Sequence, residues 1–359
     1  MRVLTLLVVT ISSVAFFLSG QLLAQSQLSI TWTDPARERE VPVKIYLPKD
    51  ASKPAPVIIF SHGLGGSRDG YSYVGKHWAS EGFVVIHPQH VGSDTSIFRN
   101  IDQKELQKIR REGWLSTPES RQELLQRVVT GKETGVGGKA MLATARGAIS
   151  FKTITDRIAD VKFVLDTLEA QNNDAKSPLA GRLDMARIGM AGHSFGANTT
   201  MLLAGQKLDV PLVDLGDVTD PRIKAAIAMS PPVALNPATY ADAYGPIKSP
   251  LMIMTGTEDN SPISRTANAD RGASFPFLIN TPAAYLVTFN GGDHGVFSGS
   301  NRSPAKQKAD VRFVEIILES STHFWNAYLR DDVASATWMS DGSFEKEMGK
   351  AGTLKVAVK

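Results

Sequence analysis

A serine between two glycines is the first feature of this sequence that could do chemistry. Gly192-His193-Ser194-Phe195-Gly196 follows a short expected strand that contains Ile188, Met190 and Ala191, and it precedes a segment of helical composition that begins near Ala197. A strand, a tight turn and a helix in this order hold a serine hydroxyl clear of the backbone, where a histidine can activate it. The pattern predicts that Ser194 is a nucleophile, and an ordinary glycine turn is the alternative.

A serine nucleophile of this kind requires an acid and then a histidine, in that order, later in the chain. Asp259 comes just after an apolar run at residues 251–254, where its carboxylate can orient an imidazole. Glu258 is the competing acid. We favour Asp259 because of its place in the turn that follows the expected strand.

His294 is the candidate base. Of the seven histidines it alone follows the acid on a loop, within residues 290–295 and after an apolar run at residues 284–289. His193 flanks the nucleophile and His323 falls inside an expected amphipathic helix, so both are predicted to be structural.

Backbone N–H groups for a developing oxyanion are expected from two places. Ser61-His62-Gly63-Leu64-Gly65-Gly66 follows an apolar run at residues 57–60, and its glycines let backbone N–H groups approach a substrate oxygen. The Leu64 N–H is the candidate for one donor, and the Phe195 N–H, just after the serine, is the candidate for the other. A plain glycine-rich turn is the alternative for the first segment.

The strands and helices that would position these residues can be predicted from the pattern of apolar residues. Two period-two segments, residues 28–32 and 41–47, predict half-exposed antiparallel strands. The run at residues 57–60 is apolar on both faces, which is typical of a central parallel strand covered by helices. Further strands are expected at residues 83–86, 223–229, 251–254 and 284–289, and helices at residues 71–80, 154–170 and 305–330.

Residues 91–150 interrupt this alternation. Charged amphipathic helices are expected at residues 103–112 and 118–129, followed by a glycine-rich stretch at residues 131–138. An insertion of this length after a central strand can form a cap over the site, with Phe98 and Trp114 offering apolar contact to a substrate. A surface elaboration remote from the site is the alternative.

The N-terminal segment has the pattern of an export signal. Residues 1–24 carry one positive charge at Arg2, then apolar runs, then small and polar residues up to Ala24. This pattern predicts a secretory signal cleaved after Ala24, leaving residues 25–359 as a single domain that is secreted or periplasmic. A retained membrane anchor is the alternative, although the apolar stretch is short for a bilayer span. The absence of cysteine means that the exported chain is stable without disulfides.

Composition excludes several function classes. The 359 residues are 42% hydrophobic and 21% charged, with a formal net charge of +3 and basic residues interleaved with acidic ones, so nucleic acid is not an expected partner. His87 and His90 flank a proline and lack further ligands at metal spacing. Asp214, Asp217 and Asp220 are interpreted as a solvated loop. No metal and no cofactor are predicted.

The four motifs that contain His62, Ser194, Asp259 and His294 occur in an order that resembles the α/β-hydrolase superfamily. The sequence is most similar to the branch that includes platelet-activating-factor acetylhydrolases and dienelactone hydrolases, over about residues 41–330. The resemblance implies a mostly parallel eight-stranded sheet with helices on both faces, no cofactor, and hydrolysis of carboxylic esters.

Two departures from this family pattern limit what carries over. Dienelactone hydrolases use a cysteine nucleophile, which this chain lacks. The acetylhydrolases of animals take their acid from the end of the preceding strand, where this sequence has Ser230-Pro231-Pro232 and no carboxylate. The identity of the substrate is therefore not implied by the resemblance.

These observations predict a serine carboxylesterase that acts through an acyl-enzyme on a small-molecule ester. Ser194 would attack, His294 would transfer protons, Asp259 would orient His294, and the N–H groups of Leu64 and Phe195 would hold the oxyanion. The alternatives are a polyester or lipid hydrolase with the same triad, and a non-catalytic binding protein on the same fold. No stable membrane anchor is expected, and the sequence leaves the oligomeric state open.

Overall fold

The computed structural model describes residues 27–50, 52–98, 147–208, 215–234, 236–260, 271–299 and 304–359. The expected export signal at residues 1–24 lies outside the described residues. So do the two helices expected at residues 103–112 and 118–129, together with Trp114.

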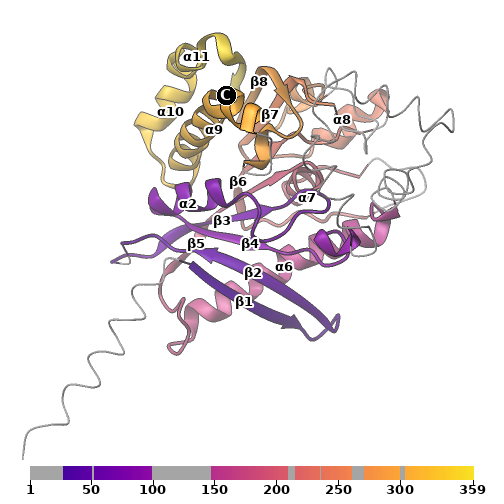
Figure 1. The fold of residues 1–359 in the computed structure, drawn as a ribbon, viewed down its shortest axis with the longest axis vertical. Coiled ribbons are helices and arrows are strands. Elements are labelled where there is room, and N and C mark those ends of the chain that lie inside the picture. Colours follow the sequence, from indigo (N-terminus) through magenta and orange to yellow (C-terminus); the bar gives the residue numbers. More distant parts are fainter. Residues whose placement is uncertain are drawn as a thin grey trace, which may run out of the picture.

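Within the described ranges, nine strands form a single sheet in the order β1-β2-β4-β3-β5-β6-β7-β8-β9 (Figure 1). The first five along the chain are β1 (Gln27–Asp34), β2 (Arg39–Tyr46), β3 (Ala55–Ser61), β4 (Val84–Pro88) and β5 (Leu183–His193). The others are β6 (Ile223–Met229), β7 (Leu251–Glu258), β8 (Ala283–Asp293) and β9 (Gly352–Val358). From β4 through β3, β5, β6 and β7 to β8, neighbouring strands are parallel, while β1, β2 and β9 join antiparallel at the edges.

The mostly parallel α/β fold is confirmed, with one strand more than the eight expected. The additional strand, β9, pairs along β8 from Ala283↔Val358 to Phe289↔Gly352. Leu354, Val356 and Val358 alternate along β9, as in a half-buried strand, but most of its residues are exposed, and the segment was not among the strands expected from the sequence.

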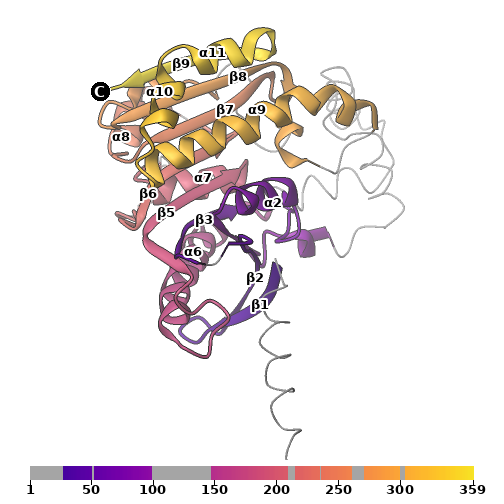
Figure 2. The ribbon, with the colours of Figure 1, turned by 90° about the vertical axis from the view of Figure 1, so that its left-hand side faces the viewer.

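Helices cover both faces of the sheet. The longer ones are α2 (Ser72–Ser80), α6 (Phe151–Asn173), α7 (Phe195–Leu203) and α9 (Pro304–Leu329). The shorter ones are α8 (Tyr240–Tyr244), α10 (Val333–Ser340) and α11 (Ser343–Met348). Figure 2 looks at the face that α2 and α9 cover.

The central strands are apolar on both faces because each face packs on a different helical layer. In β3, Ile58 and Phe60 join the core that contains α2 and α9, whereas Val57 and Ile59 join the core that contains α6. Successive side chains of a strand point to opposite faces, so an uninterrupted apolar run serves both layers. This burial explains why the run at residues 57–60 predicted a central strand correctly.

The parallel strands deliver their following residues to one edge of the sheet. β3 ends at Ser61, β5 at His193, β6 at Met229, β7 at Glu258 and β8 at Asp293. The carboxyl ends of parallel strands share an edge, and in open α/β sheets ligands bind beside that edge. Every residue singled out for chemistry therefore lies in the same part of the molecule.

The turn between β5 and α7 holds Ser194 in a strained conformation. Its φ is 55° and its ψ is −114°, outside the regions that residues with a side chain favour. Two glycines allow this turn. A Cβ added to Gly192 would lie 2.3 Å from the Gly196 carbonyl oxygen, and one added to Gly196 would lie 1.9 Å from the Ser61 carbonyl oxygen.

Replacing Gly196 by alanine is therefore expected to destabilise the fold by about 3 kcal/mol. The added methyl group would meet backbone rather than a movable side chain. It would also displace Ser194, and misplacement by about 1 Å can lower turnover roughly a hundredfold. Urea unfolding monitored by circular dichroism measures the first effect. Gly147→Ala is the control, since a Cβ there meets nothing within 4 Å, and equal destabilisation of both variants would contradict the explanation.

Candidate active site

Ser194, His294 and Asp259 are brought into hydrogen-bond contact at the carboxyl edge of the sheet. The Nε2 atom of His294 lies 2.9 Å from Ser194 Oγ, and its Nδ1 atom lies 2.7 Å from Asp259 Oδ1. Ser194 is partly exposed, whereas His294 and Asp259 are buried. A donated Nδ1–H to the carboxylate leaves Nε2 free to accept the serine proton, which is the arrangement that activates a hydroxyl.

The Asp259 carboxylate is held from several sides. Its Oδ1 accepts from Ser230 Oγ at 2.8 Å and lies 3.0 Å from Arg271 Nε, and its Oδ2 accepts from Thr255 Oγ1 at 2.8 Å. Burial alone would raise the pKa of this carboxyl. The charges of His294 and Arg271, together with the hydrogen bonds, outweigh burial and hold the pKa well below its ordinary value. The Asp259 carboxyl is therefore ionised at neutral pH.

Glu258, the competing acid, ends β7 and is partly exposed. Its backbone pairs with that of Asp293 across β7 and β8, and among the described residues no contact joins its carboxylate to His294. The turn after β7 is closed by a hydrogen bond from the Asp259 N–H to the Gly256 carbonyl. That turn directs the Asp259 side chain, and not that of Glu258, toward the imidazole.

Ser230 is a member of this site that sequence reasoning did not find. It follows β6 with a φ of 54°, is fully buried, and places its Oγ 2.6 Å from His294 Nδ1 as well as 2.8 Å from Asp259 Oδ1. Arg271 fixes this turn by donating to the carbonyls of Ser230 and Pro231. The residue that follows β6 thus holds the carboxylate of the residue that follows β7.

His193 takes a supporting position behind His294. Its Nε2–H donates to the His294 carbonyl at 3.0 Å, and its Nδ1 accepts from the Tyr71 hydroxyl at 2.8 Å. Burial, followed by the effect of His294, lowers the pKa of His193 well below its ordinary value, so the ring is neutral. The side chain of His323 lies elsewhere, stacked on Trp338 and bonded to Ser335.

The two loops that carry the expected oxyanion donors pack directly against each other. The Cα of Gly196 abuts the carbonyls of Ser61 and His62, and Gly63 lies against His193. Within the described part of the chain, the N–H groups of Leu64 and Phe195 donate to no other atom. Phe195 is the first residue of α7, where N–H groups have no partner within the helix and favour negative charge.

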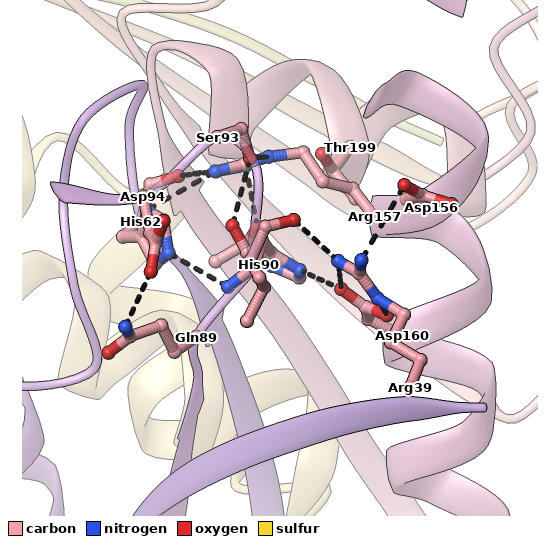
Figure 3. A network of polar contacts seen from close by, with 12 residues as sticks. Arg39, His62, Gln89, His90, Ser93, Asp94, Asp156, Arg157, Asp160 and Thr199 are labelled. Atoms are coloured by element: carbon pink, nitrogen blue, oxygen red, sulfur yellow. Dashed lines mark hydrogen bonds and ion pairs between the residues drawn. The ribbon is translucent and has the colours of Figure 1, made fainter. Parts of the chain in front are cut away.

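Arg157 is a second residue that sequence reasoning missed. Its side chain is fully buried. Figure 3 shows its guanidinium beside Ser93 and His62, the residue that begins the loop to Leu64. The sequence does contain an indication, because Arg157 falls on the same helical stripe as the buried Val161, Val164 and Leu168 of α6. A charged residue within an otherwise apolar stripe must find partners inside the protein.

Ser61, His90 and Asp160 are hydrogen-bonded in the same order as Ser194, His294 and Asp259. His90 Nε2 lies 2.9 Å from Ser61 Oγ, and His90 Nδ1 lies 3.1 Å from Asp160 Oδ2. All three residues are fully buried, whereas Ser194 is partly exposed. A nucleophile must meet its substrate, so of these two serines Ser194 is the one placed to react.

The described residues contain no group of three or more His, Asp or Glu side chains arranged to hold a metal ion. His87 and His90, which flank Pro88, are used separately: His87 Nδ1–H donates to the Gly70 carbonyl, while His90 bonds Ser61 and Asp160. Across the same described ranges, no helix is both long and apolar enough to cross a membrane.

The strand, strained serine turn and helix at the carboxyl edge of a mostly parallel sheet define a protein of the α/β-hydrolase class. Comparison with family models narrows this class, because residues 35–255 match the family described as platelet-activating factor acetylhydrolase, isoform II. The chain belongs to that family. The matched residues include Leu64 and Ser194 and end before Asp259 and His294.

Curated relatives agree with this assignment. A platelet-activating factor acetylhydrolase of Cavia porcellus is 28% identical over 239 residues, which cover 64% of this chain and 45% of the relative. The enzymes of the same name from Bos taurus and Canis lupus familiaris are 29% and 28% identical, each match covering 47% of this chain and 38% of the relative. The matches thus span less than half the length of these relatives.

Proposed function

We propose that this protein hydrolyses carboxylic esters through an acyl-enzyme on Ser194. The observation that carries the proposal is the position of His294, whose two ring nitrogens lie 2.9 Å from Ser194 Oγ and 2.7 Å from Asp259 Oδ1. The partly exposed serine, its strained turn and the N–H groups of Leu64 and Phe195, which donate to no atom of the described residues, support the same reaction.

Each step moves one proton through His294. Ser194 Oγ attacks the ester carbonyl while His294 Nε2 accepts its proton, and Asp259 stabilises the imidazolium that forms. The N–H groups of Leu64 and Phe195 donate to the oxyanion of the tetrahedral intermediate. The intermediate expels the alcohol, which takes the proton from Nε2, and leaves the acyl group on Ser194. Water, deprotonated by His294, then releases the carboxylic acid and restores the serine.

We propose that the substrate is an ester with a short acyl group. A lipid is the candidate for the alcohol part of this ester. The family description and the relatives' shared name, acetylhydrolase, support the first feature. A polyester would use the same reaction, and a binding protein on this fold would use none of it.

Two measurements test the proposal. A fluorophosphonate probe should add one label to the protein, seen as a single shift in intact mass, and p-nitrophenyl acetate should be hydrolysed with a higher kcat/KM than the palmitate ester. A folded protein that neither takes the label nor hydrolyses any ester in the series is a binding protein, and the proposal fails. Labelling with a preference for palmitate would retain the mechanism and move the substrate to long-chain lipids.

We also propose that residues 1–24 direct export to the periplasm or outside the cell, and that residues 91–150 form a cap that selects acyl length. Both proposals rest on the sequence patterns. Fractionation of the producing cells tests the first. Replacing residues 103–129 by a short linker tests the second, since an unchanged ratio of acetate to octanoate hydrolysis in a folded variant would exclude a selecting cap.

A further inference from the structure

A buried arginine lies under the loop that carries one of the oxyanion donors. Arg157 has no exposed surface, and among the described residues no carboxylate lies within ion-pair distance of its guanidinium. Both of its terminal nitrogens donate to the His62 carbonyl, at 2.9 and 2.7 Å, and its Nε donates to Ser93 Oγ at 2.9 Å. Burying a cation without a close counter-ion costs free energy of folding, so packing alone does not explain why an arginine occupies this position.

The same guanidinium contacts the second donor segment. Its Cζ atom lies 4.5 Å from the centroid of the Phe195 ring, a distance at which a cation and an aromatic face attract each other. Phe195 supplies one expected oxyanion N–H, and the His62 carbonyl belongs to the loop that supplies the other at Leu64. One side chain therefore touches both halves of the expected oxyanion hole.

The loop held by Arg157 is also fixed by its own imidazole. His62 donates from Nδ1 to the Gly63 carbonyl at 2.7 Å and accepts the backbone N–H of His90 at Nε2, at 3.1 Å. Burial, followed by the positive charge of Arg157, lowers the pKa of His62 well below its ordinary value. His62 is therefore neutral, and Arg157 is the cation beneath this loop.

A polar network behind Arg157 keeps it in place (Figure 3). Ser61 Oγ accepts from Arg157 at 3.3 Å and bonds His90, which in turn bonds Asp160. Arg39 anchors Asp160 with contacts of 2.8 and 3.0 Å. Burial, followed by Arg157, lowers the pKa of His90 to about 4, so this network does not change charge between pH 6 and 8.

We propose that Arg157 is a positioning residue for the oxyanion hole. Its hydrogen bonds to the His62 carbonyl fix the peptide that precedes Gly63, and thereby the direction of the Leu64 N–H, while its contact with the Phe195 ring holds the second N–H beside the first. Burial lowers the pKa of Arg157 to about 9, so the guanidinium remains charged at neutral pH and adds positive potential where the oxyanion develops. The proposal rests on the ester-hydrolase function proposed above.

Lysine cannot replace this side chain. It keeps a positive charge, but its single ammonium group cannot donate to the His62 carbonyl and Ser93 while a planar face lies on Phe195. Because the loss of one oxyanion donor lowers kcat by about 10²–10³, Arg157→Lys is expected to lower kcat by up to that factor. KM should change less than about threefold, since the oxyanion exists only in the transition state.

Arg330→Lys is a matched control at the opposite edge of the sheet. Arg330 also donates to two backbone carbonyls, those of Glu81 and Gly82, and its guanidinium lies 3.9 Å from the Phe83 ring centroid. The two substitutions remove the same kinds of contact. Only the one at Arg157 is expected to reduce kcat.

The experiment compares wild type, Arg157→Lys and Arg330→Lys in p-nitrophenyl acetate kinetics, in thermal unfolding, and in binding of a trifluoromethyl ketone that forms an oxyanion adduct with an active serine. Arg157→Lys should lose kcat and ketone affinity in parallel, with a change in melting temperature no larger than the control shows. If Arg157→Lys does not fold, Phe195→Leu serves instead. It keeps the backbone N–H and removes the ring, and a roughly threefold to thirtyfold loss of kcat is expected.

Two results would overturn the proposal. The first is a fall in kcat that only parallels the fall in melting temperature in both arginine variants. The second is wild-type kcat in Arg157→Lys or, if that variant does not fold, wild-type kcat in Phe195→Leu. These results differ from failure of the proposed function, in which the wild-type protein itself neither hydrolyses esters nor binds the ketone.

Discussion

Replacing Ser194 by alanine is expected to lower the turnover of p-nitrophenyl acetate by about a millionfold, down to the level that binding and the oxyanion donors sustain without a nucleophile. The Oγ that the substitution removes is the atom 2.9 Å from His294 Nε2. Alanine tolerates the positive φ of this position no worse than serine, so stability should change little. Steady-state kinetics and thermal unfolding of the purified variant measure both effects.

Labelling with a fluorophosphonate tests the same nucleophile at the level of a single residue. Peptide mapping of the labelled wild-type protein should place the label on the peptide that contains Ser194. Ser61 is the internal control, since it too has a histidine and an aspartate beside it but is fully buried. Wild-type turnover in Ser194→Ala, or a label on Ser61, would show that the proposed mechanism is wrong.

Asp259→Asn is expected to lower kcat about 10⁴-fold, whereas Glu258→Gln should have little effect. An asparagine can present its amide N–H to His294 Nδ1 and so favour the imidazole tautomer that carries its proton on Nε2. That tautomer cannot accept the proton of Ser194. The substitution also leaves the buried Arg271 without its carboxylate partner, 3.0 Å away, so the kinetics must be compared with thermal unfolding of each variant.

Glu258→Gln is the matched control, because it changes the neighbouring carboxylate in the same way and leaves Arg271 paired. The opposite ranking of the two variants would move the acid to Glu258. Equal and small losses would mean that the Ser230 hydroxyl, 2.6 Å from His294 Nδ1, is enough to orient the imidazole without a carboxylate.

The sequence by itself determined the central strands and the edge of the sheet at which the candidate catalytic residues lie. Apolar runs at residues 57–60, 223–229 and 251–254 became strands because residues that are apolar on two faces are stable only between two layers of helices. The residues just after parallel strands share one edge, so Ser194, Asp259 and His294 could be expected near one another before any distance was known.

Only the tertiary structure decided which side chains meet. Ser194 and His294 are 100 positions apart, and neither spacing nor periodicity states that a turn after β7 aims Asp259, and not Glu258, at the imidazole. Strand β9 was not expected from the sequence although Leu354, Val356 and Val358 alternate along it, and its pairing with β8 is a contact that only the tertiary structure shows.

The same limit applies to the residues behind the site. Arg157 is one charged position on an apolar helical stripe, and the sequence does not say whether such a residue reaches solvent or turns inward. Packing of α6 against the loop after β3 decided that question, because it closed Arg157 off from water and placed it against the His62 carbonyl, the hydroxyls of Ser61 and Ser93, and the Phe195 ring. Local pattern determines what each segment can form, whereas contacts between distant segments decide what each side chain touches.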